Sequence, residues 1–129
     1  MYMCSTLRTL DGTAWPMCGV LPGETRMCDR LQALGYVEID TLGDSILGRI
    51  GTHFRGHQFR YSNIEMDSRV VNRIYRLTRR RGGRATAEGF AMNRVIGTYV
   101  HAHWGSNPHI PEALVRACSE HQVSNDDPP

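Results

Sequence analysis

Short apolar runs separated by glycine and proline dominate the chain and predict several β-strands. Residues 36–40 alternate apolar and acidic side chains, as in a strand that is buried on one face. The other stretches predicted as strands or extended segments are residues 17–21, 49–62 with a kink or bulge at Gly56, 70–77 and 95–100. The last of these is rich in β-branched residues and is expected to deliver His101 at its C-terminal end.

Helical periodicity is weaker and occurs in three places. Residues 1–8 have no capping residue ahead of their apolar positions, which predicts a helix entered partway along its length. Apolar side chains repeat at intervals of four and three over residues 27–34, which predicts one or two helical turns. A final helix is expected to start near Pro111, because proline suits the first turn of a helix. We expect one domain over residues 1–121 and a disordered polar tail over 122–129.

The amino-acid composition of the chain excludes several classes of function. The chain has 129 residues, of which 40% are hydrophobic and 22% charged, as expected for one small globular domain. It contains neither a long apolar run nor a secretory signal, so we expect a cytoplasmic protein without a membrane segment. All 15 basic residues are arginine. The absence of lysine excludes a Walker-type phosphate loop and Schiff-base catalysis in this chain.

Neither the cysteines nor the clustered arginines indicate a functional site. No CxxC pair occurs among Cys4, Cys18, Cys28 and Cys118, so we expect reduced thiols and no metal site. Cys4 falls within a predicted helix and lacks the glycines that flank an exposed nucleophile. The arginine-rich loop 79–84 suits phosphate contacts, but the net charge of only +2 favours a solvated loop over a nucleic-acid site.

Three stretches in a fixed order carry a family resemblance, the first of them in two parts. They are residues 19–23 with 30–36, then Arg-Gly-His-Gln-Phe-Arg-Tyr-Ser at 55–62, then Gly-Thr-Tyr-Val-His-Ala-His-Trp at 97–104. Together they resemble the CobB/CobQ-type glutamine amidotransferase domain of the cobyrinic acid a,c-diamide synthase family, over nearly the whole chain to about residue 118. A lone Tyr-x-His is weak as a signal, whereas the ordered set is strong.

The resemblance implies an α/β fold of the class I, flavodoxin-like glutaminase type, a sheet with flanking helices. A cysteine on a strand-to-helix elbow then attacks the side-chain amide of glutamine, and a histidine on a later strand takes the thiol proton. In the whole family protein, an N-terminal domain uses ATP and Mg²⁺ to activate carboxylates of a corrinoid, and the released ammonia converts them to amides. No cofactor is expected in this chain itself. Residues 1–3 match the end of the segment that follows the nucleophile, so we expect the cysteine upstream of residue 1 and little activity from the chain alone.

Three histidines are the candidate site residues implied by the resemblance. His101 matches the proposed catalytic base, and His103, two residues on, would face the same side of a strand and either orient His101 or act as the base itself. His57 is expected to line the substrate pocket. Gln58 stands where family members commonly have Glu, which removes any carboxylate role there. Each histidine can also be read as a packing or surface residue.

Three other functions are kept open. The first is amidation of another tetrapyrrole acid, such as sirohydrochlorin. The second is a non-catalytic remnant that binds a partner chain through an exposed sheet edge. The third and weakest is nucleic-acid binding by the arginine loop.

Overall fold

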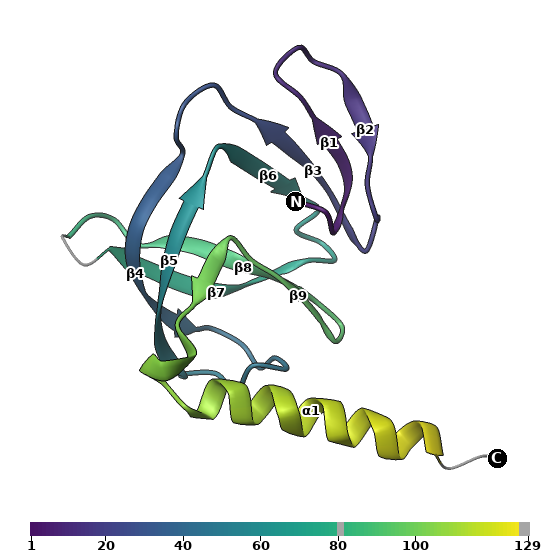
Figure 1. Ribbon diagram of the computed structural model, residues 1–129, viewed down its shortest axis with the longest axis vertical. Coiled ribbons are helices and arrows are strands. Elements are labelled where there is room, and N and C mark those ends of the chain that lie inside the picture. Colours follow the sequence, from purple (N-terminus) through teal and green to yellow (C-terminus); the bar gives the residue numbers. More distant parts are fainter. Residues whose placement is uncertain (80–81, 127–129) are drawn as a thin grey trace.

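The computed structural model describes residues 1–79 and 82–126. These residues form two sheets, a short 3₁₀ helix η1 (Trp104–Ser106) and one α-helix, α1 (His109–Asp126) (Figure 1). The first sheet has the order β2-β1-β3-β6 and consists of β1 (Cys4–Arg8), β2 (Ala14–Pro16), β3 (Leu21–Met27) and β6 (Ser62–Met66). The second has the order β10-β5-β4-β7-β8-β9 and consists of β4 (Ala33–Thr41), β5 (His53–Arg60), β7 (Asn72–Arg79), β8 (Thr86–Met92), β9 (Val95–Gly97) and β10 (Val100–Ala102). The protein is therefore a strand-rich mixed α/β domain.

The six-stranded sheet is antiparallel throughout and has an inner and an outer face. Along β4, Val37 and Ile39 are buried while Tyr36 is 73% exposed, as the two-residue period of a strand requires. The main core lies on the inner face and comprises Val37, Ile39, Phe54, Ile74, Tyr75, Leu77, Val100 and Ile110. A second cluster of Leu21, Val71 and Phe90 joins the two sheets. The solvent-exposed outer face of β4 and β5 is therefore left available for a site.

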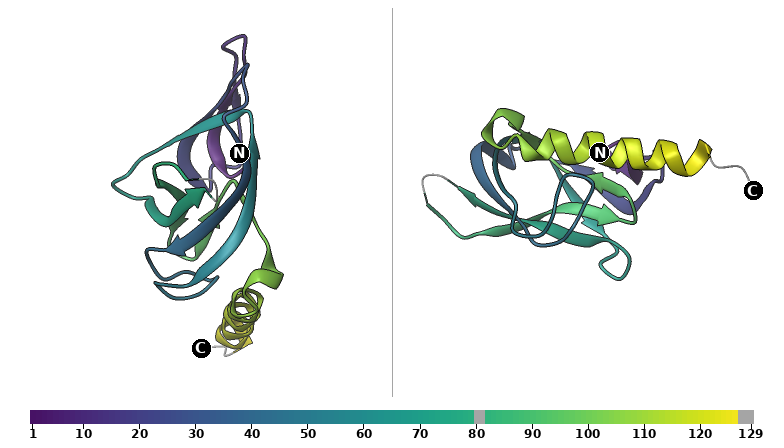
Figure 2. Two further views of the ribbon diagram at one scale, coloured as in Figure 1. Left: turned by 90° about the vertical axis from the view of Figure 1, so that its left-hand side faces the viewer. Right: turned by 90° about the horizontal axis from the view of Figure 1, so that it is seen from below.

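Helix α1 lies across one end of the strand layers and extends away from them (Figures 1 and 2). Ile110, in its first turn, is completely buried and joins the main core, whereas Val115 is 65% exposed. Farther along, the Nη2 of Arg94 donates to the carbonyl of Ala117 at 3.1 Å. The helix is thus anchored mainly at its N-terminal end.

Gly56 is required for a close approach of two strands. The pairing of β4 with β5 runs through Gly56 without a shift in register, so β5 has no bulge there. A Cβ at this position would overlap Cγ1 of Val100 and lie 2.9 Å from the carbonyl oxygen of His101. Glycine therefore allows β10 to pack tightly against β5.

Some of the helices and strands predicted from the sequence are present in the structure, and others are not. The strands expected at 36–40 and 70–77 correspond to β4 and β7, the extended segment 49–62 contains β5, and the final helix is present. The helix expected at residues 1–8 is wrong, because the segment pairs with β2 and β3 as strand β1. The strand expected at 17–21 begins only at Leu21.

The helical turns expected at 27–34 are also wrong. The Cys28 amide donates to the Tyr61 carbonyl and the Gln32 amide donates to the Arg60 carbonyl, so the backbone there pairs with a distant segment. Helices flanking the sheet were expected, but the described residues contain only α1. That helix continues through residues 122–126 of the expected tail, and residues 127–129 and 80–81 lie outside the described part of the chain.

Candidate functional site

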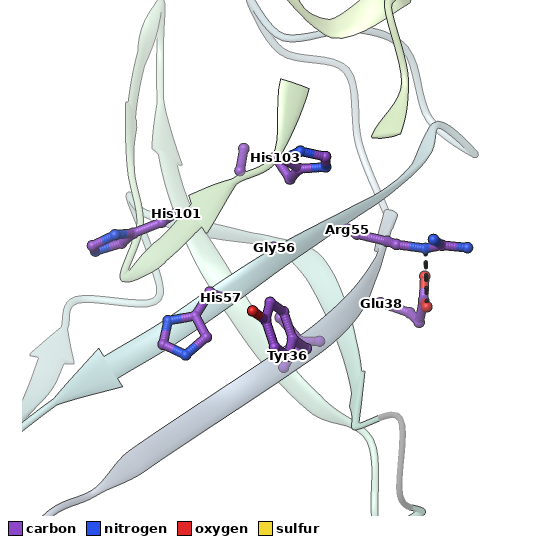
Figure 3. Close-up of a pocket in the computed structure, with 9 residues that line it drawn as sticks. Tyr36, Glu38, Arg55, Gly56, His57, His101 and His103 are labelled. Atoms are coloured by element: carbon purple, nitrogen blue, oxygen red, sulfur yellow. Dashed lines mark ion pairs between the residues drawn. The ribbon is translucent and has the colours of Figure 1, made fainter. Parts of the chain in front are cut away.

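The outer face of the six-stranded sheet carries a groove of about 580 Å³, which we call the histidine groove (Figure 3). Residues from β4, β5, β10 and the segment after β10 line it: Tyr36, Val37, Glu38, Arg55, Gly56, His57, His101, Ala102 and His103. The three strands are neighbours in the sheet although they lie far apart in the sequence. Antiparallel pairing therefore assembles the groove.

Strand register sets Tyr36, His57 and His101 in one row. His101 is directly opposite His57, and His57 is directly opposite Tyr36. Side chains at paired positions share a face, with Cβ atoms about 4.5–5.5 Å apart. The rings of Tyr36 and His57 meet edge to face with their centroids 5.2 Å apart. The structure thus brings His57 and His101 together, as Figure 3 shows.

His101 has an exposed and unengaged side chain. Its imidazole makes no hydrogen bond or ion pair with any other described residue. It lies on β10, which pairs only with β5 among the described strands and so forms an edge of the sheet. The single strand expected over residues 95–100 is instead two short strands, β9 and β10, and His101 is the middle residue of β10. An imidazole so placed can exchange a proton with a group that approaches from outside.

His103 occupies a different part of the groove. It follows the last residue of β10, at the N-cap position of η1, and lines the same groove as His101, as the two-residue period of a strand predicts. Its amide donates to the carbonyl of Arg55 at 2.9 Å, and its carbonyl accepts from Oγ of Ser106 at 2.6 Å. In Figure 3 His103 lies on the Arg55 side and His101 on the His57 side.

A family model described as "CobB/CobQ-like glutamine amidotransferase domain" matches residues 1–109, which include the whole histidine groove. The chain belongs to this amidotransferase family.

Individual relatives agree with the family match. The chain is 40% identical over 119 residues to the cobyrinate a,c-diamide synthase of Leptospira interrogans, covering 92% of this chain and 26% of the relative. It is 33% identical over 120 residues to the enzyme of that name from Syntrophotalea carbinolica, with the same coverage. It is 36% identical over 119 residues to the hydrogenobyrinate a,c-diamide synthase of Streptomyces coelicolor, covering 92% of this chain and 22% of the relative. The chain therefore spans about a quarter of the length of these relatives.

A charged network borders the groove in this amidotransferase domain. The carboxylate of Glu38 contacts Nε2 of His53 at 3.0 Å and Nε of Arg55 at 3.3 Å. That of Asp40 contacts Nδ1 of His53 at 2.9 Å and Nη2 of Arg76 at 3.0 Å. The hydrogen bond from His53, followed by that from Arg76, lowers the pKa of Asp40. No motif in the sequence marks His53. It lies two residues from Arg55 on β5, just as Glu38 lies two residues from Asp40 on β4, so all four side chains are on one face of the sheet.

We expect His53 to give the domain a weak pH-dependent stability. The hydrogen bond to Asp40, opposed by desolvation and aided by Glu38, raises the pKa of His53 above 6.5. The stabilisation is therefore complete below pH 6.5 and is lost as the pH rises through the raised value. The effect should be a few tenths of a kcal/mol, because the side chain is 56% exposed and solvent screens the pair. Urea unfolding of His53→Asn between pH 6 and 8 should show a flatter pH dependence than the parent.

The matched control for this test is His101→Asn, which removes a histidine whose ring has no partner among the described residues. An equal change in both variants would mean that the His53–Asp40 pair contributes nothing.

The cysteines lie away from the histidine groove. The nine residues that line the groove, all in the described part of the chain, include no cysteine. Cys4 is 1% exposed on β1, and its Sγ accepts a hydrogen bond from Oγ1 of Thr25 at 3.2 Å. Cys18 and Cys118 are exposed, and Cys28 is partly buried. Within these 129 residues, no thiol lines the groove with His101.

This burial pattern predicts the order of thiol reactivity. In the native chain, a disulfide reagent such as dithionitrobenzoate should modify Cys18 and Cys118 rapidly and Cys28 more slowly. Cys4 should react only when urea unfolds the chain, because a buried thiol must be exposed before it is attacked. Cys18→Ser should lose one fast equivalent and leave the slow phases unchanged. Rapid modification of four thiols in the native state would contradict the burial of Cys4.

Gln58, where family members commonly have Glu, lies on the opposite side of the sheet from the groove. It follows His57 on β5, so it faces the inner side of the sheet, where it is 7% exposed. There it lines a separate cavity of about 140 Å³ with Arg60 and Glu88.

Within the described residues, no group of three or more His, Cys, Asp or Glu side chains is arranged to hold a metal ion. No described helix is long and apolar enough to cross a membrane.

Proposed function

We propose that this chain is part of the glutaminase domain of an ATP-dependent amidotransferase, and that His101 is its catalytic base. The observation that carries the proposal is the unengaged imidazole of His101 on an edge strand, in a groove that belongs to the stretch matched by the family model. A general base must be free to take a proton and reachable by the group that loses it. His101 meets both conditions, whereas His53 is held by two carboxylates.

The proposed reaction uses a cysteine supplied by polypeptide outside these 129 residues. His101 takes the proton of the thiol, and the thiolate attacks the side-chain carbonyl carbon of glutamine. The imidazolium returns the proton to the leaving nitrogen, so that ammonia departs and a glutamyl thioester remains. Water then hydrolyses the thioester to glutamate and regenerates the thiol. In this scheme His57 and Tyr36 line the pocket beside the base.

The open edge of β10 is where we propose that the cysteine-bearing segment joins the sheet. An edge strand presents unpaired backbone groups that another strand can complete. Such an addition would extend the sheet toward the class I, flavodoxin-like arrangement and bring the thiol next to His101. The exposed rings of Tyr36 and Phe59 on the outer face would be covered in the process.

The acceptor of the ammonia is proposed from the relatives' names. Cobyrinate and hydrogenobyrinate are the substrates named for the relatives, so we propose that the a- and c-carboxylates of such a corrinoid are amidated in cobalamin biosynthesis in the cytoplasm. The alternative substrate is another tetrapyrrole acid, such as sirohydrochlorin. This chain has no lysine and no Walker-type loop, so the residues present do not fit ATP, and we assign ATP and Mg²⁺ to a separate synthetase domain.

A joined polypeptide tests the proposal. We define it as residues 1–129 preceded by a cysteine-bearing amidotransferase segment, either the native one or that of the Leptospira interrogans relative. It should release ammonia and glutamate from glutamine, and residues 1–129 alone should not. Replacement of the upstream cysteine by alanine is the control and should abolish release. A joined polypeptide that is folded but inactive would contradict the proposed function.

A non-catalytic role is the second candidate, and the open edge of β10 favours it equally. In that case residues 1–129 would act as a partner-binding module. They would form a stable complex with a separate upstream chain, and the complex would not hydrolyse glutamine. Size-exclusion chromatography of the mixture, followed by the ammonia assay, separates the two functions.

A further inference from the structure

A buried carboxylate holds the segment that leads into β10. Glu88 lies on β8 and is 6% exposed. It accepts a hydrogen bond from Oγ1 of Thr98 at 2.6 Å and another from the amide of Tyr99 at 2.7 Å. Oγ1 of Thr98 in turn accepts from the amide of Val100 at 2.9 Å. Glu88 thus binds the Tyr99 amide directly and is linked to the Val100 amide through the Thr98 hydroxyl.

These residues need such a partner because they lie between two strands. β9 ends at Gly97 and β10 begins at Val100, so Thr98 and Tyr99 belong to neither ladder. Buried backbone amides without a partner are costly, and charge-assisted hydrogen bonds are the stronger kind. Burial raises the pKa of Glu88, while the bonds from Thr98 and Tyr99 oppose that rise. An apolar residue at position 88 would pack there but would leave the Tyr99 amide without this acceptor.

The side chain of Tyr99 makes further contacts that hold the same segment. Its hydroxyl lies 2.6 Å from Oγ of Ser62 on β6. The guanidinium carbon of Arg60, on β5, lies 5.1 Å from the centre of its ring. Contacts from β5, β6 and β8 therefore converge on the residue that precedes Val100 and His101.

We propose that Glu88 is a positioning residue for His101, acting through the backbone of Thr98, Tyr99 and Val100. This inference rests on the proposed function of His101 as the base. β10 is only three residues long and pairs with one described strand, so its path depends on how the chain enters it. Loss of the Glu88 contacts lets the 98–100 segment shift and moves the imidazole in the groove. A misplacement of about 1 Å can cost on the order of 100-fold in rate.

Glu88→Gln in the joined polypeptide tests the proposal, since glutamine has nearly the same shape but only one acceptor oxygen. We expect kcat for glutamine hydrolysis to fall by about 10- to 100-fold while KM stays within about twofold, because positioning of the base affects the chemical step. Glu88→Asp should also lose activity, since its shorter side chain cannot reach both donors. The matched control is Glu65→Gln, the same change at an exposed position of β6, which should leave kcat unchanged. All rates should be measured at a temperature at which urea titration shows every variant fully folded.

A readout that needs no activity separates this inference from the proposed function. In residues 1–129 alone, the NMR resonances of the Tyr99 amide and the His101 imidazole should shift in Glu88→Gln and not in Glu65→Gln. If those resonances shift but the unmodified joined polypeptide is inactive, the proposed function fails while the control of His101 by Glu88 is supported. If Glu88→Gln is folded and matches Glu65→Gln in kcat and in these resonances, the positioning role is overturned.

Discussion

Replacing His101 with alanine is expected to lower glutamine hydrolysis by the joined polypeptide by about 10²–10⁴-fold, the usual contribution of a general base. The imidazole is exposed and has no partner among the described residues, so its removal should leave the fold intact. The thiol would then have no group to take its proton, and kcat should carry most of the loss. Ammonia release under saturating glutamine measures the effect.

The neighbouring histidines provide the controls for this experiment. His103→Ala should cost less than about tenfold, because its ring lies on the Arg55 side of the groove. His109→Ala changes an exposed histidine of α1 outside the groove and should be neutral. If His103→Ala abolished hydrolysis and His101→Ala did not, the base would be His103 and the assignment would be reversed.

Replacing Gly89 with alanine is expected to destabilise the chain by about 2–5 kcal/mol. Gly89 has a φ of +70°, a region that costs an L-residue about 1–2 kcal/mol. A Cβ there would also lie 2.5 Å from Cδ2 and 2.6 Å from Cγ of Tyr75, whose ring is fully buried. Overpacking of this kind typically adds about 1–3 kcal/mol. The free energy of unfolding of residues 1–129 in urea measures the loss.

Gly51→Ala separates the two causes. Gly51 has a similar φ of +81°, but no atom lies within 4 Å of its ideal Cβ. This variant should therefore lose only the conformational part, about 1–2 kcal/mol. Equal losses at both positions would mean that Tyr75 moves aside without cost and that the core around it is loosely packed.

The elements that were predicted correctly are those in which the order of apolar and polar residues follows directly from which side chains are buried. Residues 36–40 alternate because one face of β4 is core and the other is the groove. The helix predicted at residues 1–8 was wrong because this segment, which includes the buried Cys4, is a strand that pairs with residues 14–16 and 21–27. Local periodicity cannot report such pairing, and β-structure depends on tertiary context.

The candidate site was predictable in its members more than in its arrangement. The resemblance singled out His57 and His101, and antiparallel register then set them directly opposite one another. His103 lines the same groove, as its spacing of two residues from His101 predicts, but it lies at the Arg55 end. Glu88 was missed because a single glutamate in an otherwise apolar strand carries no motif, and its importance arises only from the contacts with Thr98 and Tyr99.

The central claim is that the histidine groove forms the base half of a cysteine–histidine site. The most direct measurement is a crystal structure of the joined polypeptide with its cysteine alkylated by an electrophilic glutamine analogue. The account predicts that the modified Sγ lies beside β10, within about 3–4 Å of a ring nitrogen of His101, and that the analogue occupies the groove next to His57. A thiol that is alkylated away from β10, with His101 facing solvent, would contradict it.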